Sequence, residues 1–353
     1  KLLLQLNRFG PMKRLREFDV LKGLSITAVV LIHVTSHGVG TFDPTSTSYF
    51  VYLILNRLSQ FAVPTFIFAS SVLLSYIHGD GFRSMTTEKL KTFYRKRFVR
   101  IIPPYLIWTL VYLVVKHIES NGTVRVTWGN YFNLLLRGDG YYHLYFVVVI
   151  LQVYILLPFI MYVVSHLKVR FRQILLISIG VQVACYYLYE FYIIHYFPRG
   201  TRLMIWYLAV ILVGVWIGEN YEEYCKRERH VTIFLPVALV SGVLYTYCYH
   251  LSNIGQLVSS GIVNLWWYIY VSSTPLLLLY ISKKVNIRFF ERAGQLSFGI
   301  FLMHPLFLFI MNRIYATANA ILYDIFVFFI IYSLSYIITK WLEATPWGKY
   351  IVG

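Results

Sequence analysis

Long apolar segments recur along the chain and are separated by short polar stretches that are mostly basic. A helix needs about 20 apolar residues to cross the hydrocarbon core of a bilayer, and most segments have about that length. Backbone polar groups inside lipid must be satisfied within the segment, so the pattern predicts transmembrane helices. Ten spans are expected, the sixth being the shortest: 20–40, 49–77, 98–118, 142–165, 173–196, 203–218, 231–250, 259–281, 296–313 and 320–341.

These spans predict an all-α, polytopic membrane protein with about ten transmembrane helices and no soluble domain. One membrane domain is expected over 20–341, between an N-terminal segment, 1–19, and a C-terminal tail, 342–353. Residues 1–11 precede Met12. We interpret them as an added remnant or an upstream extension and leave them out of the functional argument.

The composition supports a membrane environment. Hydrophobic residues make up 58% of the chain and charged residues 13%, whereas about a quarter of the residues in a soluble domain are charged. Aromatic residues reach 18%, with 31 Tyr. Tyr suits membrane interfaces, and this many Tyr also suits a cavity that binds a polar ligand.

Basic residues set the expected orientation. The net charge is +17, and 25 of the 32 Lys and Arg fall on one side when the spans alternate from a cytoplasmic N-terminus. The other side holds six, and Arg57 remains inside a span. Because cytoplasmic loops are enriched in Lys and Arg, both termini are expected in the cytoplasm. Orientation and anionic lipid explain this charge without a nucleic-acid partner, and an anionic cofactor is the sharper alternative.

The first span carries a polar stripe made of Asp19, Lys22, His33 and His37. Lys22 and His33 are eleven residues apart, so they share one helix face at a separation of about 16 Å along the axis. Ionisable groups inside a span are costly and usually functional. We expect His33, Lys22 and Asp19 to be catalytic, with neutral His33 as a general base. A helix-packing stripe is the structural alternative.

A metal site is a further alternative for this helix, because His33 and His37 stand at positions i and i+4. No third ligand lies nearby in the sequence, so no metal is expected. Cys185, Cys225 and Cys248 are far apart and lack the spacing of metal ligands. They are expected to serve in packing.

Four cations fall within six residues at the start of the third span: Arg95, Lys96, Arg97 and Arg100. Anchoring on the positive side of the membrane explains such a run by itself. The functional alternative is a phosphate clamp, because Arg binds phosphate through two parallel hydrogen bonds. Coenzyme A is cytoplasmic and carries several phosphate groups, so these residues are expected to hold an acyl-CoA.

Single polar residues in or beside other spans are candidate contacts for a second substrate. Arg57 lies inside the second span, where an unpaired guanidinium is costly. His143 opens the fourth span, Gln152 follows inside it, and His304 interrupts the ninth. These residues and His37 are expected to bind the acceptor. Anchoring at the membrane interface is the alternative for His143 and His304.

Taken in order, these residues make the chain resemble the acyltransferase-3 family of integral membrane acyltransferases. The first span matches the family's pattern of a basic residue, ten residues and a histidine. The third span begins with an Arg-rich run that ends Arg-Ile-x-Pro. A Phe-x-x-Pro-x-Phe-x-x-x-Ser run and a Met-His-Pro run complete the resemblance. The matching positions are Lys22 and His33, Arg97 and Arg100–Pro103, Phe61–Ser70, and Met303–Pro305.

Within the family, the chain most resembles the membrane proteins of staphylococcal intercellular-adhesion polysaccharide clusters and their Bacillus relatives, through the run Gly140–Gln152. That group is described both as polysaccharide exporters and as O-acyltransferases. Two departures matter. Residues 150–152 are Ile-Leu-Gln where many members that modify lipopolysaccharide have an acidic pair, so a catalytic Glu here is absent or moved. Lys22 stands where many members have Arg.

The resemblance implies an O-acyltransferase of the bacterial cell (inner) membrane. It would move an acetyl or succinyl group from cytoplasmic acyl-CoA to a hydroxyl of a cell-surface or lipid-linked carbohydrate, with His33 as base or acyl carrier. The rival hypotheses are a polysaccharide or lipid-linked sugar exporter without acyl-transfer chemistry, and a binding or sensing membrane protein. Acyl-CoA, the carbohydrate acceptor and membrane lipids are the expected partners, and the sequence leaves oligomerisation open.

Overall fold

The computed structural model describes residues 15–82, 86–123, 127–226, 231–285, 287–314 and 321–353, and all regular secondary structure in these ranges is helical. The expected all-α fold is confirmed. The segment 1–11 that the sequence sets aside lies outside the described residues.

Long helices account for most of the chain. In order they are α2 (Arg16–Thr41), α3 (Thr47–Leu58), α4 (Ala62–Phe82), α5 (Thr87–Glu119), α7 (Tyr145–Leu167), α8 (Phe171–Leu188), α9 (Leu208–Glu219), α11 (Val231–Asn253), α12 (Ser260–Lys284), α14 (Ser297–Ile314) and α15 (Ile321–Glu343). Shorter helices connect them: α6 (Trp128–Arg137), α10 (Tyr221–Lys226), α13 (Arg288–Gln295) and α16 (Gly348–Ile351). A π-helical turn, Tyr189–Ile193, and two 3₁₀ turns, Gly200–Arg202 and Met204–Tyr207, lie between α8 and α9.

Nine helical segments in the described ranges are long and apolar enough to cross a membrane, counting Thr47–His78, which joins α3 and α4, as one. They match nine of the ten expected spans. The tenth, expected at 203–218, is the apolar stretch Met204–Glu219, which is shorter. Its residues are buried over most of their length, against α4, α7 and α8. The described ranges therefore hold nine full-length spans and one short apolar helix that packs against three of them.

α3 and α4 divide a stretch that the sequence predicts as one continuous span. α3 ends at Leu58, and α4 begins at Ala62 with Pro64 in its first turn. Proline costs no hydrogen bond there, because the first amides of a helix have no partner within it. The break turns Arg57 and Gln60 toward an internal cavity.

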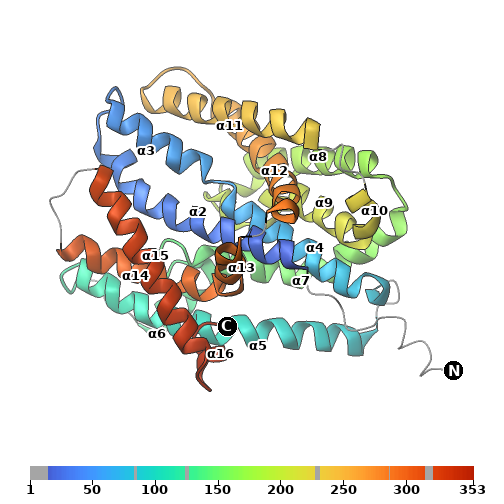
Figure 1. Ribbon diagram of the computed structural model, residues 1–353, viewed down its shortest axis with the longest axis horizontal. Helices are drawn as coiled ribbons and strands as arrows, with labels where there is room; N and C mark the ends of the chain where they lie inside the picture. The colour runs from blue at the N-terminus through green and yellow to red at the C-terminus, as the bar shows by residue number, and fades with distance from the viewer. Residues whose placement is uncertain (1–14, 83–85, 124–126, 227–230, 286, 315–320) are drawn as a thin grey trace.

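α2 lies among the other helices and contacts α3, α4, α12, α13, α14 and α15 (Figure 1). α13 approaches it at glycines. A Cβ atom on Gly294 would lie 1.7 Å from the carbonyl oxygen of Asp19, and one on Gly23 would lie 1.9 Å from that of Phe290. Only a residue without a side chain permits this approach. The first turns of α2 are therefore fixed against α13.

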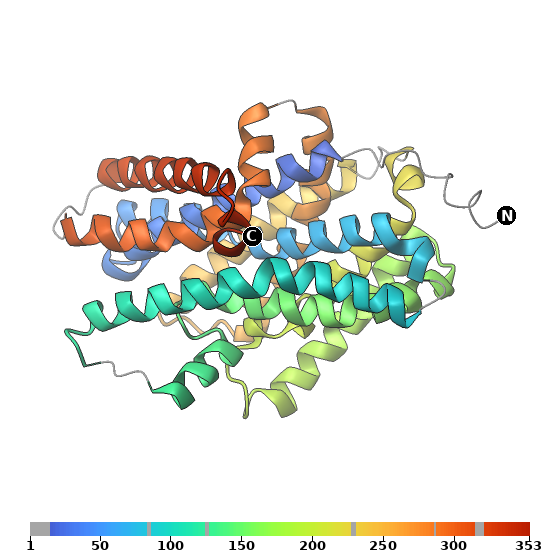
Figure 2. The ribbon, with the colours of Figure 1, turned by 90° about the horizontal axis from the view of Figure 1, so that it is seen from below.

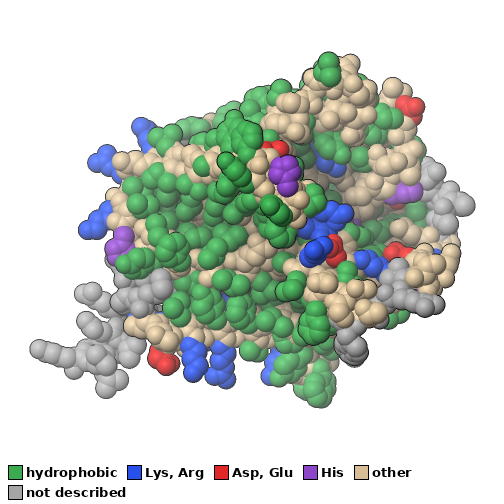
Figure 3. Space-filling model, turned by 180° about the vertical axis from the view of Figure 1, so that it is seen from behind, with side chains coloured by type: hydrophobic (Ala, Val, Ile, Leu, Met, Phe, Trp, Pro, Cys, Tyr) green, Lys and Arg blue, Asp and Glu red, His purple; other side chains and the backbone are tan. Residues whose placement is uncertain are grey.

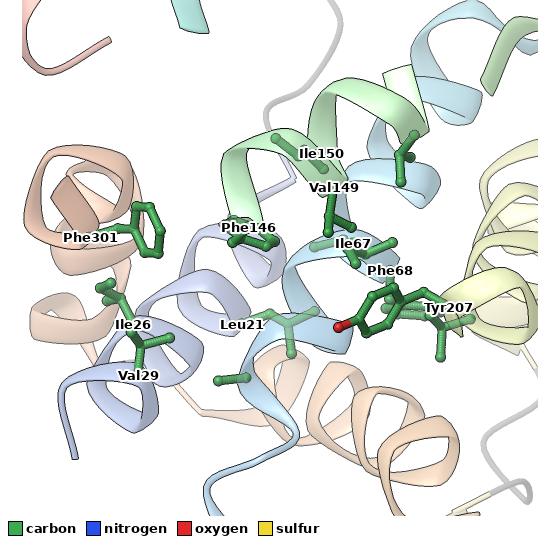
Figure 4. Close-up of a cluster of buried hydrophobic side chains, with 14 of the residues drawn as sticks. Leu21, Ile26, Val29, Ile67, Phe68, Phe146, Val149, Ile150, Tyr207 and Phe301 are labelled. Atoms are coloured by element: carbon green, nitrogen blue, oxygen red, sulfur yellow. The ribbon is translucent and has the colours of Figure 1, made fainter. Parts of the chain in front are cut away.

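A buried apolar core lies beside the middle of α2 (Figure 4). Val29 of α2, Phe68 of α4, Phe146 of α7 and Phe301 of α14 all belong to it. Three of them stand about one helical turn from a histidine: Val29 precedes His33, Phe146 follows His143, and Phe301 precedes His304. The packing of this core therefore sets where the three histidines lie.

Apolar side chains face outward on the long helices. Val114 is 60% exposed, Leu176 is 71% exposed and Phe329 is 62% exposed. Hydrophobic side chains cover much of the face in Figure 3, and Lys and Arg lie at its left end, along its lower edge and in a group right of centre. Figure 2 shows α14 and α15 running side by side along this apolar body. Such a surface is suited to lipid, and the chain is a multi-pass membrane protein.

The segment 342–353, expected as a tail, folds back onto α5. The indole N–H of Trp108 donates to the carbonyl oxygen of Ile351 at 2.9 Å, and Val352 is buried. α16 therefore rests against the helix that carries the basic run.

Candidate active site

Three histidines that are far apart in the sequence meet beside the middle of α2. His33 comes from α2, His143 from the turn before α7, and His304 from α14. The ring centroid of His304 lies 5.1 Å from that of His33 and 5.6 Å from that of His143. The sequence predicts each of the three as a site residue, and the fold brings them into one cluster.

Several ring nitrogens of this cluster lack a hydrogen-bond partner. Nδ1 of His304 lies 3.1 Å from the carbonyl oxygen of Ile300. Because a carbonyl oxygen only accepts, Nδ1 carries the proton and Nε2 keeps its lone pair in the neutral ring. That Nε2 and both ring nitrogens of His143 are buried with no partner among the described residues. Buried polar atoms are nearly always hydrogen-bonded, so the cluster is arranged to meet a polar ligand.

A cavity of about 290 Å³ opens at this cluster and is lined by His33 and His143. Arg57 and Gln60 reach it from the break between α3 and α4. Its other walls are mainly aromatic, and they include Tyr145, Trp206, Tyr207, Tyr245, Tyr249 and Trp267. This combination of a few polar groups with apolar walls is typical of a small-molecule site.

A tyrosine holds α14 open beside His304. The hydroxyl of Tyr112 donates to the carbonyl oxygen of Leu302 at 2.6 Å and accepts from the backbone N–H of Leu306 at 3.2 Å. These two backbone groups would bond to each other in a regular helix, and Pro305 lies between them. The inserted hydroxyl therefore fixes the local shape of α14 at the turn that carries His304.

A wider cavity of about 670 Å³ reaches the cluster from the side of Tyr142. Tyr142 lines this cavity, and its ring centroid lies 4.8 Å from that of His33. Its charged lining residues are Lys116, Glu119, Asp139, Arg199, Arg202 and Arg313. A polar chamber thus leads to the phenol that covers His33.

Acidic groups in the wider cavity have partners. Arg202 forms an ion pair with Asp139, and the Tyr141 hydroxyl donates to Glu119 at 2.8 Å. Burial and the neighbouring Glu119 carboxylate raise the pKa of Tyr141 above its ordinary value. Tyr141 therefore remains a hydrogen-bond donor at neutral pH.

Lys22 and Asp19 lie away from this cluster, near the start of α2. Lys22 Nζ lies 3.3 Å from an Asp19 carboxylate oxygen, and Asp19 is buried against α13. The helix rise separates Lys22 from His33 by about 16 Å. The structure therefore groups Asp19 with Lys22, and it does not bring this pair to the histidines.

Two other predicted residues lie outside the histidine cavity. His37 is exposed near the end of α2, where it interacts electrostatically with Asp324 of α15. Gln152 donates to the carbonyl oxygen of Arg202 at 3.0 Å and accepts from the backbone N–H of Met204 at 3.0 Å. Its amide joins α7 to the turns before α9.

The basic run lies on α5, apart from the histidine cavity. Arg97 lies 3.0 Å from Nε2 of His78 and stacks on Phe93 at 4.3 Å from the ring centroid. With Lys96 it lines a cavity of about 340 Å³. The other two cations, Arg95 and Arg100, are exposed. This cavity and the histidine cavity have no lining residue in common among those described.

Sequence reasoning missed the tyrosines that complete the histidine cluster. Tyr112 contacts His143 at a centroid distance of 4.9 Å, and Tyr142 contacts His33. Tyr142 could have been predicted as a site residue, because it directly precedes His143 in the run Gly140–Gln152. Tyr112 lies in the middle of the third span, whereas tyrosines of membrane proteins are usually enriched at the membrane interfaces. This unusual position was the signal for Tyr112.

No group of three or more His, Cys, Asp or Glu side chains within the described ranges could hold a metal ion.

Comparisons with known proteins identify bacterial relatives of this chain. Proteins of Staphylococcus aureus strains Mu50, MSSA476 and MW2, each named "Probable poly-beta-1,6-N-acetyl-D-glucosamine export protein", are 23% identical to this chain over 327 residues. The similarity covers 87% of this chain and 86% of each relative. No solved structure matches the chain.

The family relationship extends over nearly the whole membrane domain. The acyltransferase-3 family model, which describes an acyltransferase domain, matches residues 15–340 of this chain. This range contains eight of the nine long spans in full, most of the ninth, Ile321–Glu343, and the three histidines. With the bacterial relatives, it identifies the chain as a multi-pass protein of a bacterial membrane. The chain belongs to the acyltransferase-3 family.

Proposed function

We propose that this protein transfers an acetyl or succinyl group from cytoplasmic acyl-CoA to a hydroxyl of a cell-surface or lipid-linked carbohydrate. The observation that carries this proposal is the cluster of His33, His143 and His304, in which both ring nitrogens of His143 and Nε2 of His304 are buried with no described partner. An imidazole with a free lone pair at such a place is suited to general-base catalysis. The family supports acyl transfer as the reaction.

Acyl transfer requires a base that removes the proton of the acceptor hydroxyl and a thioester carbonyl that the hydroxyl oxygen can reach. His33 faces the cavity and takes the proton of the acceptor hydroxyl. The hydroxyl oxygen then attacks the thioester carbonyl carbon, the carbon–sulfur bond breaks, and the imidazolium returns the proton to the leaving thiolate. If His33 takes the acyl group first, the same bond breaks and the hydroxyl attacks the acyl-imidazole in a second step.

His304 and His143 assist this step by position. Nε2 of His304 and both ring nitrogens of His143 are buried without a described partner, and the two ring centroids lie 5.6 Å apart. A ring that keeps its lone pair can orient the acceptor hydroxyl or hold a proton next to His33. The Tyr112 hydroxyl in the α14 backbone keeps His304 in place.

The two substrates would approach from opposite sides. Arg95, Lys96, Arg97 and Arg100 lie on α5, and we assign this run to the phosphates of acyl-CoA on the cytoplasmic side. The wider cavity with Tyr142 at its inner wall would admit the carbohydrate from the outer side. Transfer through the histidine cluster then avoids moving charged coenzyme A across lipid.

Purified full-length protein in lipid nanodiscs tests the proposal. Acetyl-CoA or succinyl-CoA labelled in the acyl group is mixed with a β-1,6-linked N-acetylglucosamine oligosaccharide, a probe chosen from the name of the staphylococcal relatives. Label in the oligosaccharide, measured by mass spectrometry and lost on mild alkaline treatment, supports O-acyl transfer. No label with either donor, from protein that binds acyl-CoA, counts against it.

Export without acyl transfer is the second candidate, because the staphylococcal relatives are named export proteins. The wider cavity and its charged lining would suit a passing glycan equally well. Transport of a fluorescent oligosaccharide into sealed vesicles, in the absence of any acyl-CoA, would favour this candidate.

A further inference from the structure

An arginine without an acidic partner faces the same cavity as His33. Nη1 of Arg57 donates to the Tyr245 hydroxyl at a long 3.4 Å, and the guanidinium lies over the ring of Tyr249, 3.8 Å from its centroid. Its Nε is buried with no hydrogen-bond partner among the described residues. A guanidinium has five N–H donors, so most of the hydrogen-bonding capacity of Arg57 remains unused.

The walls of the cavity supply no counter-charge. None of the described residues that line it is Asp or Glu, and none of the described ion pairs includes Arg57. Arg57 also lies within a membrane-spanning stretch, where an isolated cation is costly. By contrast, Arg202 in the wider cavity is paired with Asp139. The counter-charge for Arg57 is therefore expected from a ligand.

The position of Arg57 relative to His33 is fixed by the residue before it. The buried side-chain amide of Asn56 donates to the carbonyl oxygen of Ile32 at 2.9 Å and to the hydroxyl of Thr35 at 3.1 Å. Asn56 and Ile32 directly precede Arg57 and His33 in the chain. This contact locks α3 against α2, so that the guanidinium and the imidazole stay on the wall of one cavity.

We propose that Arg57 binds an oxyanion of the substrate, a carboxylate or a phosphate, while the reacting group of the same complex lies at His33. This inference rests on the proposed function and narrows its substrate class to one that carries a negative charge inside the cavity. Arginine binds such groups through two parallel charged hydrogen bonds, and the aromatic walls keep water from competing.

Two sources would supply this oxyanion. One is the distal carboxylate of a dicarboxylic acyl group such as succinyl, in which case an acetyl donor leaves Arg57 without a counter-ion. The other is a phosphate on the acceptor, such as the one that joins a sugar to a lipid. Either group would bind the Arg57 guanidinium through charged hydrogen bonds. Pairs of substrates that differ in only one of these groups distinguish the two sources.

Relative kcat/KM values in two arms provide the test. In the first arm, succinyl-CoA is compared with acetyl-CoA on the same neutral β-1,6-linked N-acetylglucosamine oligosaccharide. In the second, acetyl-CoA is used with that oligosaccharide and with its glycosyl phosphate. Wild-type protein is expected to prefer the anionic substrate in one arm. Arg57→Gln should lower that preference by about tenfold to a hundredfold, as expected for lost charged hydrogen bonds.

Three variants separate binding from folding. Arg57→Lys keeps the charge and should retain part of the preference. Arg292→Gln makes the same chemical change at an exposed position of α13, outside the cavity, and should leave the preference unchanged. The inference is overturned if wild-type protein shows no preference in either arm, or if Arg57→Gln slows all substrate pairs by one common factor.

A direct binding measurement keeps this inference distinct from the proposed reaction. If no substrate pair reacts, the proposed function fails, and titration with succinate, inorganic phosphate and uncharged succinamide still decides the role of Arg57. Trp206 and Trp267 line the cavity, so tryptophan fluorescence reports binding. Succinate or phosphate should bind wild-type protein about tenfold more tightly than Arg57→Gln. Equal affinity of both proteins for both anions would exclude the site.

Discussion

The imidazole rings of His33 and His304 stack with their centroids 5.1 Å apart and their planes 28° from parallel. They come from α2 and α14, near opposite ends of the chain. The hydrogen bond from Nδ1 of His304 to Ile300 directs its free Nε2 lone pair away from its own backbone. One ring can therefore act on a substrate hydroxyl while its neighbour orients that hydroxyl, and this division of roles gives distinct expectations for the two residues.

Replacing His33 should abolish acyl transfer while leaving acyl-CoA binding nearly intact, because a base acts mainly in the transition state. Loss of a general base costs about 10²–10⁴-fold in rate. His33→Gln retains hydrogen bonding but cannot shuttle a proton, so it should be as inactive as His33→Ala. The measurement is single-turnover transfer, with acyl-CoA affinity determined in parallel by calorimetry.

A covalent role for His33 has its own signature. Protein incubated with acyl-CoA and no acceptor should then carry an acyl group that mass spectrometry locates on His33, and His33→Gln should carry none. Near-native transfer by His33→Gln would make His33 structural, and His304 would become the better candidate for the base.

Tyr112→Phe should reduce transfer although Tyr112 itself does not line the histidine cavity. The change removes the hydroxyl between Leu302 and Leu306 and leaves two buried backbone groups without their bridge. Such a loss costs about 1–3 kcal/mol in stability, and it frees the turn that positions His304. We expect a lower unfolding temperature and a lower kcat, with acyl-CoA affinity unchanged.

Tyr131→Phe is the matched control for this change, because the hydroxyl of Tyr131 on α6 donates at a long 3.4 Å to the carbonyl oxygen of Leu106 on α5, a contact that does not involve α14. Full activity of Tyr112→Phe, together with an unfolding temperature like that of Tyr131→Phe, would show that the bridge has no part in placing His304.

The sequence predicts the helical fold and most of the cluster, for reasons that can be traced to particular residues. Apolar length alone identifies a transmembrane helix, so nine spans follow directly from the sequence. His33, His143 and His304 are recognisable because ionisable groups are rare in spans. The break at Ser59–Phe61 is not recognisable in this way, since the apolar residues on both sides of it add up to one long span and only Pro64 indicates a helix start.

The sequence does not predict which helices far apart in the chain contact one another. Lys22 and His33 share a helix face, yet Lys22 is engaged by Asp19, and only the packing of α13 on Gly23 explains why Asp19 is buried there. Gln152 looks like a substrate contact in a span until the backbone of residues 202–204 is seen to use both ends of its amide. Burial patterns of this kind depend on the tertiary arrangement.

Cysteine labelling should place the two ends of α5 on opposite sides of the membrane. In a protein whose Cys185, Cys225 and Cys248 are replaced by Ala, new cysteines at the exposed positions Thr87 and Thr123 report the two sides. A membrane-impermeant maleimide should label Thr123→Cys in intact cells and Thr87→Cys only after permeabilisation, because Lys and Arg favour the cytoplasmic side. Labelling of Thr87→Cys from outside would reverse the orientation and the side assigned to the donor.

The basic run on α5 should bind the phosphates of acyl-CoA. Each charged hydrogen bond to phosphate contributes about 1.5–3 kcal/mol, so Arg97→Ala and Arg100→Ala should each weaken acyl-CoA binding about tenfold or more. Arg100 is exposed, and screening by salt should lower the wild-type affinity as ionic strength rises. Calorimetry at two salt concentrations measures both effects.

Arg172→Ala supplies the control, because Arg172 is an exposed arginine on α8, away from the basic run. Arg97 also contacts His78 and Phe93, so its removal affects local packing, whereas Arg100→Ala tests charge with less structural change. A phosphate clamp requires Arg100→Ala to bind acyl-CoA more weakly than Arg172→Ala and to show a shallower salt dependence than the wild type. If the two variants bind alike, the run serves membrane orientation alone, and the donor must be held by groups nearer to the histidines.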